Sequence, residues 1–266
     1  MSGAKVVCGG VDEYPSTPQG PKIEPSLRWV RVKLGKTCVA DSRHTLLLRQ
    51  YGHGRLPTYY FPPQDVRMEL LARTPAASRP GGAISWTVQV GDLSVEDAAW
   101  TEAEPAPEYA ELKGYVSFAW NKGLTWLEEE EQVFVHARDP YKRVDAIQSS
   151  RHVQVVIDGT TVADTYRPTL VFETNWPPRY YIPQEDVRMD LLEPSNATTR
   201  CPYKGIASYW SFKAADGLKR NIVWSYLEPI AECPKIKGLL CFFNEHVDLY
   251  EDGNLLARPR TSFSRD

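Results

Sequence analysis

The chain contains one stretch of sequence twice. Residues 59–71 (YYFPPQDVRMELL) and residues 180–192 (YYIPQEDVRMDLL) are identical at nine of thirteen positions. Matches on both sides of these segments follow in the same order, for example Trp86 with Trp210, and the offset stays between 121 and 124 residues. A constant offset over so long a stretch indicates a duplicated domain. With two copies of this size, the chain is not a solenoid of short repeats.

The duplication divides the chain into five segments. The N-terminal segment is rich in glycine, proline and serine, which is typical of a flexible arm. The segment between the copies carries too many charges for a core and too many arginines and tyrosines for a flexible linker. We expect an arm over 1–27, a first repeat over 28–137, a charged connector over 138–151, a second repeat over 152–258 and a tail over 259–266.

Composition excludes several classes of protein. Eight tryptophans, 14 tyrosines and eight phenylalanines are too many aromatic residues for a disordered chain. A net charge of -3 argues against a general nucleic-acid binder. The sequence has no apolar run of about 18 residues that would cross a membrane, and its N-terminus lacks the apolar region of a secretory signal. We therefore expect a cytoplasmic protein that contacts neither membrane nor nucleic acid.

The cysteines and the loop motifs argue against bound cofactors. The five cysteines are scattered, and no CxxC pair occurs. This arrangement favours reduced thiols over a zinc site or a disulfide scaffold. The glycine-rich motifs that cradle phosphate groups, GxGxxG and GxxxxGK followed by serine or threonine, are absent. We expect no metal and no cofactor.

The hydrophobic pattern is mostly that of β-strands. Alternating polar and apolar residues predict strands at 29–34 and 153–157, and Asp158-Gly159 after the second run predicts a hairpin turn. Residues 65–71 and 186–192 instead follow a proline and begin with acidic groups, so we predict one short helix in each copy. Many short strands with little helix predict the all-β class with a small α contribution.

Three motifs of the second copy carry a family resemblance. They are residues 162–164 (VAD), 179–183 (RYYIP) and 201–210 (CPYKGIASYW). These residues resemble the domain-of-unknown-function family 427, which also carries a nucleotidyltransferase-like label, and the resemblance covers nearly the whole chain as two tandem copies. It implies two β-tent-like domains, each a twisted antiparallel sheet pair with one short helix, and it implies no established activity. Some β-tent relatives hold zinc, and we expect apolar packing to replace it here.

The two copies differ where chemistry would be expected. The second copy has CPYKG at 201–205 where the first has ASRPG at 77–81, and it has Glu173 where the first has Gln50. The first copy thus keeps the predicted helix but lacks the thiol, the lysine and the acid. The glutamates at 128–131 in the first copy are expected to be a solvated strand end. We therefore expect the functional site in the second copy.

Cys201, Lys204 and Glu173 are the candidate catalytic residues. A lysine beside a cysteine can stabilise a nucleophilic thiolate, and a lysine whose pKa is lowered by its surroundings can act as a base or form a Schiff base. The alternative is a structural turn that Gly205 closes and in which Lys204 is solvated. Glu173 and Arg179 flank a Trp-Pro-Pro turn, where they could form a charge-assisted pair or orient a polar ligand.

The aromatic residues of the second copy are candidate ligand contacts. Tyrosine and tryptophan rings suit a planar or cationic ligand, and the alternative is that they fill the core of a thin sheet. Neighbouring strand residues face opposite sides, so one of Tyr180 and Tyr181 is expected to line an outer face or a cleft. The candidate ligand-binding residues are Arg179, Tyr181, Arg188, Tyr203, Tyr209, Trp210 and Trp224.

Three functions remain compatible with the sequence. The favoured one is binding of a small molecule in the second copy, with or without a modest acid–base or isomerisation reaction. Nucleotidyl transfer needs paired metal-binding carboxylates and a phosphate cradle, and neither is visible. The third is a non-catalytic interaction module in which the duplication forms an internal pseudo-dimer, with the oligomeric state left open. Its surface for an acidic partner or a phosphate would be the connector, with Arg138, Asp139, Tyr141, Arg143, Arg151 and His152.

Overall fold

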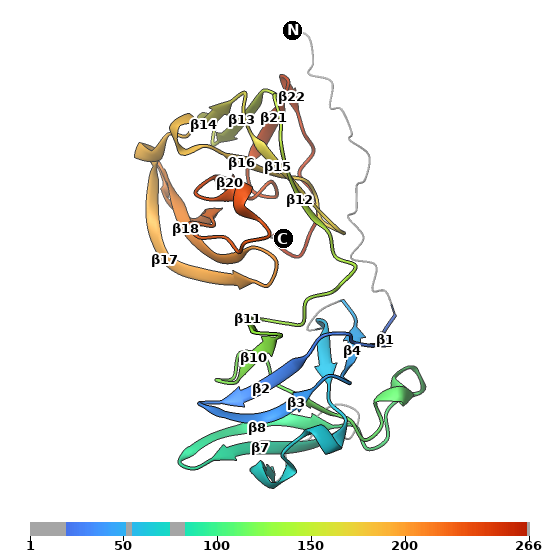
Figure 1. The fold of residues 1–266 in the computed structure, drawn as a ribbon. Coiled ribbons are helices and arrows are strands. Elements are labelled where there is room, and N and C mark those ends of the chain that lie inside the picture. The colour runs from blue at the N-terminus through green and yellow to red at the C-terminus, as the bar shows by residue number, and fades with distance from the viewer. Residues whose placement is uncertain (1–19, 52–54, 75–82, 265–266) are drawn as a thin grey trace. The chain divides into compact units, whose positions relative to one another are not determined.

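The computed structural model describes residues 20–51, 55–74 and 83–264. Most of the expected arm over 1–27 lies outside these residues, and so does the first-copy segment 77–81. The chain forms two compact units, of which the first ends at Pro140 and the second begins at Tyr141. We refer to them as the first and the second domain (Figure 1).

The first domain consists of short antiparallel strands. Along β2, Val30, Val32 and Leu34 are buried and alternate with partly exposed Arg31 and Lys33, as a strand with one core-facing side requires. The described strands are β1 (Lys22–Pro25), β2 (Val30–Leu34), β3 (Thr37–Ser42), β4 (Leu46–Arg49), β5 (Thr58–Tyr60), β6 (Leu71–Arg73), β7 (Ile84–Val90), β8 (Leu93–Thr101), β9 (Val116–Phe118), β10 (Thr125–Glu128) and β11 (Glu131–Val133). Their sheets have the orders β1-β4-β5, β11-β10-β2-β3 and β6-β7-β8-β9.

The second domain has the same plan with longer strands. The predicted hairpin is confirmed, because Asp158 and Gly159 both have positive φ angles and connect β13 to β14. The described strands are β12 (Val144–Gln148), β13 (Val153–Ile157), β14 (Thr160–Thr165), β15 (Thr169–Glu173), β16 (Arg179–Ile182), β17 (Leu192–Cys201), β18 (Gly205–Ala214), β19 (Gly217–Ser225), β20 (Leu240–Phe242), β21 (Asp248–Glu251) and β22 (Asn254–Leu255). They form a seven-stranded sheet, β12-β15-β16-β20-β19-β18-β17, and a four-stranded sheet, β14-β13-β21-β22. In Figure 1, β17 and β18 are the long neighbouring strands of this domain.

The strand orders of the two domains correspond one to one. The seven-stranded sheet of the second domain is represented in the first by two sheets, β1-β4-β5 and β9-β8-β7-β6, which a single bridge between Phe61 and Val116 connects. The register agrees as well, because Leu47 pairs with Tyr59 in the first domain and Leu170 pairs with Tyr180 in the second. The prediction of an all-β chain built from two copies is confirmed. The β-tent shape implied by the resemblance stays a prediction.

The predicted short helix is two separate 3-10 turns in each copy. Between the two turns of the first copy, Val66 is extended, with a φ of -115°, and forms a bridge with Ala40. This pairing with β3 interrupts the helix that the sequence pattern predicts. The 3-10 turns in the described parts of the chain are Pro63–Asp65, Met68–Leu70, Pro107–Leu112, Gln184–Asp186, Met189–Leu191 and Pro234–Ile236. Among the described residues, no helix has the length and apolar composition needed to cross a membrane.

Each face of the seven-stranded sheet carries a buried apolar cluster. Tyr180 belongs to one apolar cluster, with Ile182 and Phe242, and Tyr181 belongs to another, with Trp224. Strand alternation therefore separates the two tyrosines as expected, but neither is exposed. The expectation that one of them lines an outer face or a cleft is wrong, because each face has its own core. We call the face that contains Tyr181 and Trp224 the site face.

Candidate functional site

The turn at 201–205 (CPYKG) directs the Lys204 side chain into the second domain. The Lys204 backbone N–H donates to the Cys201 carbonyl at 3.4 Å, and its carbonyl accepts from the Ile230 N–H at 3.1 Å. Gly205 has a φ of +107°, and a Cβ atom there would lie 3.3 Å from the Glu228 carbonyl oxygen, so only glycine fits without strain. Lys204 is buried. The structural-turn alternative expected Lys204 to be solvated, and that expectation is wrong.

Lys204 and Lys142 share the carboxylate of Glu173. Glu173 ends β15 on the site face, where its Oε2 accepts a hydrogen bond from the Lys204 ammonium group and its Oε1 lies 2.9 Å from Lys142 Nζ. Burial raises the pKa of Glu173, but the charges of the two lysines outweigh burial and hold it below its ordinary value. Burial lowers the pKa of Lys204, but Glu173 outweighs burial and raises it. Glu173 and Lys204 are therefore both charged at neutral pH.

Lys142 also contacts two aromatic rings. Its Nζ lies 5.4 Å from the Tyr203 ring centroid and 5.9 Å from the Trp176 ring centroid, within the range of cation–π attraction. Sequence analysis did not single out Lys142, which lies in the expected connector just before β12. No motif marks it, because its partners lie more than 30 residues further along the chain.

Arg179 pairs with Glu245. Its two terminal nitrogens each donate to the Glu245 carboxylate at 2.7 Å, and the Glu245 side chain is fully buried. Thr261 Oγ1 adds a hydrogen bond of 2.6 Å to the same carboxylate. Burial raises the pKa of Glu245, but Arg179 lowers it overall. The alternative in which Arg179 pairs with Glu173 is wrong, because Arg179 binds Glu245 and Glu173 binds the two lysines.

A hollow of about 330 Å³ opens on the site face. Tyr209 contributes a ring whose hydroxyl lies 2.7 Å from Thr199 Oγ1. Phe263, from the expected tail, stacks on Trp176 at 5.2 Å and meets Phe243 at 5.4 Å. The residues around the hollow are Ala197, Thr199, Tyr209, Asn221, Phe243, His246 and Phe263.

The cysteines of this domain lie beside the same cluster. Cys201, Cys233 and Cys241 pack into the apolar cluster of the site face. Burial raises the pKa of the Cys233 thiol and of the Cys241 thiol, so these two groups are protonated at neutral pH. Among the residues that the structure describes, no group of three or more histidine, cysteine, aspartate or glutamate residues is placed to hold a metal ion.

The comparison with protein families identifies both copies. The family described as Domain of unknown function (DUF427) matches residues 22–129 and residues 145–253. The chain belongs to this family. The first match begins at the first residue of β1 and the second begins within β12, and these are corresponding edge strands of the two domains. The matches reach β10 and β21, so each covers its domain except the last short strand, β11 in the first domain and β22 in the second. No curated protein matches the chain.

Within this DUF427 chain, some candidate ligand residues lie apart from the hollow. Trp210 packs against the core on the other face of the sheet, and Arg188 is exposed and pairs with Asp190 at 2.6 Å. Tyr181 is buried and accepts a hydrogen bond of 3.1 Å from Trp224 Nε1. Of the candidate aromatic residues, Tyr209 is the one that lines the hollow.

The charged connector residues pair within their own domains. In the first domain, Arg138 Nη2 lies 3.1 Å from Glu131, and Asp139 accepts a hydrogen bond of 2.6 Å from the Tyr51 hydroxyl. In the second domain the pairs are Arg143 with Asp145 at 2.7 Å, Arg151 with Glu251 at 3.0 Å and His152 with Asp164 at 2.8 Å. Tyr141 is exposed. These ion pairs reduce the positive charge that the connector could offer to an acidic partner.

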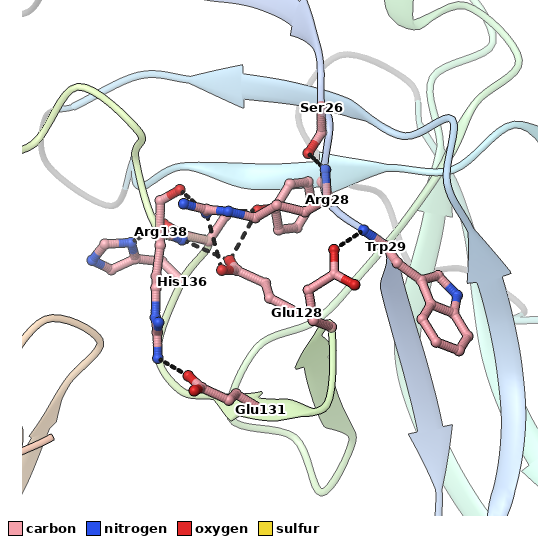
Figure 2. Close-up of polar contacts among 10 residues, drawn as sticks. Ser26, Arg28, Trp29, Glu128, Glu131, His136 and Arg138 are labelled. Atoms are coloured by element: carbon pink, nitrogen blue, oxygen red, sulfur yellow. Dashed lines mark hydrogen bonds and ion pairs between the residues drawn. The ribbon is translucent and has the colours of Figure 1, made fainter. Parts of the chain in front are cut away.

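An arginine, a glutamate and a tyrosine form the same cluster in both DUF427 copies. Figure 2 shows Arg28 and the Arg138 backbone beside Glu128. Glu128 also accepts a hydrogen bond of 2.9 Å from the Tyr59 hydroxyl. In the second domain, Glu251 binds Arg151 at 3.0 Å and Tyr180 at 2.8 Å. Glu128 is buried, so it is not part of a solvated strand end. This cluster belongs to the fold rather than to the function of one copy.

Proposed function

We propose that the second domain binds a small planar molecule in the hollow between Tyr209, Phe243 and Phe263. The observation that carries the proposal is the difference between the copies. Tyr209 pairs with Trp224 across β18 and β19, and the corresponding partner of Trp100 in the first domain is Ser85. Aromatic walls are suited to stacking on a planar ligand.

A second position shows the same difference. Phe243 follows β20 and donates its N–H to the Ile222 carbonyl, and Ala119 follows β9 and donates to the corresponding Ala98 carbonyl. The second copy therefore has rings at two positions where the first copy has small side chains. The hollow also has the size of a small-ligand site, because such sites start at roughly 300 Å³.

The buried ion pairs support binding rather than catalysis. Lys204 remains an ammonium group, which is neither a base nor a nucleophile for Schiff-base formation. Glu173 and Glu245 are ionised, and each of their carboxylate oxygens contacts a lysine or an arginine. Glu245 also holds Thr261, two residues before Phe263, and so helps to keep that wall of the hollow in place. The free thiols of the described cysteines fit a reducing compartment such as the cytoplasm.

Calorimetric titration with a panel of planar compounds, such as indoles, naphthalenes and purines, tests the proposal. We expect at least one class to bind the full chain. The double variant Tyr209→Ser with Phe243→Ala introduces the first-copy residues, and we expect it to lose that binding. The control is Arg188→Ala, a change on the same domain that removes only the contact with Asp190. The proposal is wrong if no class binds or if the double variant binds as tightly as the original chain.

A further inference from the structure

The two domains carry a β-bulge at the same place. The register of β8 against β7 shifts between Trp86 and Val88, and that of β19 against β18 shifts between Trp210 and Phe212. The residue at the bulge has a positive φ in both domains, 50° for Asp97 in the first and 55° for Asn221 in the second. A bulge turns its side chain away from the regular alternation of the strand, so both side chains are placed by the same backbone feature.

In the first domain the bulge holds a carboxylate with two donors. Asp97 Oδ1 accepts a hydrogen bond of 2.6 Å from the Ser85 hydroxyl, and Asp97 Oδ2 lies 3.2 Å from Lys122 Nζ. Lys122 lies in the loop that follows β9, and its ammonium group also donates to the Asp97 carbonyl at 3.0 Å. The space beside this bulge is thus filled by an acid of the chain itself.

In the second domain the bulge holds a neutral amide. The backbone N–H of Asn221 donates to Ser211 Oγ at 3.1 Å, and its side chain lines the hollow. Tyr209 occupies the strand position that Ser85 has in the first domain, and His246 lies in the loop that follows β20. The second domain therefore has a tyrosine in place of the serine and a histidine in the following loop, replaces the acid by an amide, and has a hollow beside the bulge.

We infer that the planar ligand carries a carboxylate, which lies beside Asn221 and His246 in the position that the Asp97 carboxylate has in the first domain. This inference rests on the proposed function of the hollow. An amide N–H and an imidazole N–H are donors that suit a carboxylate. The ring of such a ligand would stack between Tyr209, Phe243 and Phe263.

Matched pairs of ligands separate this inference from the proposed function. We expect 2-naphthoate to bind the full chain at least about tenfold more tightly than 2-naphthamide, and indole-3-acetate more tightly than indole-3-acetamide, in calorimetric titrations at neutral pH. If acid and amide bind equally, the hollow is a planar-ligand site but the inference of an acid is wrong. If neither member of any pair binds, the proposed function itself fails.

The substitution Asn221→Asp supplies the sharper test. It places at the second bulge the residue that the first bulge already accommodates at nearly the same φ, so the fold should tolerate it. Like charges at short range repel, so we expect affinity for the acid to fall at least about tenfold while affinity for the amide stays unchanged. Asp97→Asn in the first domain is the matched control and should change neither affinity.

A second variant protects the test against an unstable protein. His246→Gln removes the basic group but keeps a hydrogen-bond donor, and we expect it to lower affinity for the acid more than affinity for the amide. Equal losses for acid and amide in both Asn221→Asp and His246→Gln would overturn the inference, because they would show a change in the shape of the hollow rather than in its charge.

Discussion

The Lys204 ammonium group binds Glu173 inside the second domain, and Lys142 binds the other oxygen of the same carboxylate. One acid therefore pairs with two lysines that come from different parts of the chain, the turn at 201–205 and the segment before β12. In the first domain the corresponding position is Gln50, whose side chain accepts a hydrogen bond of 3.2 Å from the Tyr109 hydroxyl. The ionic cluster is thus a feature of the second domain. Glu173 contacts both lysines, whereas each lysine contacts one oxygen of Glu173.

Glu173→Gln should destabilise the protein more than Lys204→Met. Removing the acid leaves the buried Lys204 and the largely buried Lys142 facing a neutral amide, and removing one partner of a buried ion pair typically costs about 3–5 kcal/mol. Removing Lys204 leaves Glu173 paired with Lys142, so the loss of unfolding free energy should be smaller. Urea denaturation of both variants measures the order, with Lys237→Met, a change in the exposed pair with Glu228, as a control near zero. The reverse order would show that Lys142 does not compensate.

Acid should unfold the second domain through Glu173 and Glu245. The pKa of each is below its ordinary value of 4.5 in the folded chain, because nearby cations outweigh the effect of burial. A carboxyl whose pKa is lower in the folded state stabilises the fold above its unfolded-state pKa, and this contribution is lost as the pH falls through the folded-state pKa. We expect the free energy of unfolding to fall below about pH 4.5 and to depend less on pH in Glu245→Gln. An unchanged pH dependence in that variant would contradict this assignment.

The sequence predicts what local patterns determine. The repeated segments 59–71 and 180–192, the alternation along β13 and the turn at Asp158-Gly159 each depend on neighbouring residues, and the structure agrees with all of them. The helical spacing at 186–192 is also local, but Val187 pairs with Ala163 of β14 and interrupts the helix. Contacts with a distant strand thus override the local preference.

The partners of the charged residues could not be predicted. Glu173 precedes Arg179 by six residues, which suggests a pair, but their true partners come from residues 142, 204 and 245. The four glutamates at 128–131 look alike in sequence, and the strand pairing buries Glu128 while the other three stay exposed. Phe263 lies in a polar tail, and its contact with Trp176 follows only from the folded chain.

Tyr59→Phe and Tyr180→Phe should destabilise the two domains in the same way. Each hydroxyl donates to a glutamate that also binds an arginine, Glu128 in the first domain and Glu251 in the second. A lost hydrogen bond to a charged group typically costs about 1.5–3 kcal/mol. We expect the larger loss for Tyr59→Phe, because the Glu128 side chain is 6% exposed and that of Glu251 is 22% exposed. Equilibrium unfolding in urea measures both values, and equal stability of Tyr59→Phe and the original chain would contradict a structural role.

Phe263→Ala should weaken binding of a planar ligand with little effect on the fold. The ring forms one wall of the hollow and is itself 46% exposed, so its removal takes away mainly its contacts with Trp176 and Phe243. Aromatic pairs contribute about 0.5–1.5 kcal/mol beyond their burial, and we expect a loss of unfolding free energy in that range and a fall in affinity of about tenfold. Thr261→Val keeps the ring but removes the hydrogen bond to Glu245, so its affinity should lie between those of the original chain and Phe263→Ala. Calorimetric titration of the three proteins with the same ligand gives this order. Tighter binding in Phe263→Ala would show instead that Phe263 occupies the place of the ligand, because its removal would then free the hollow.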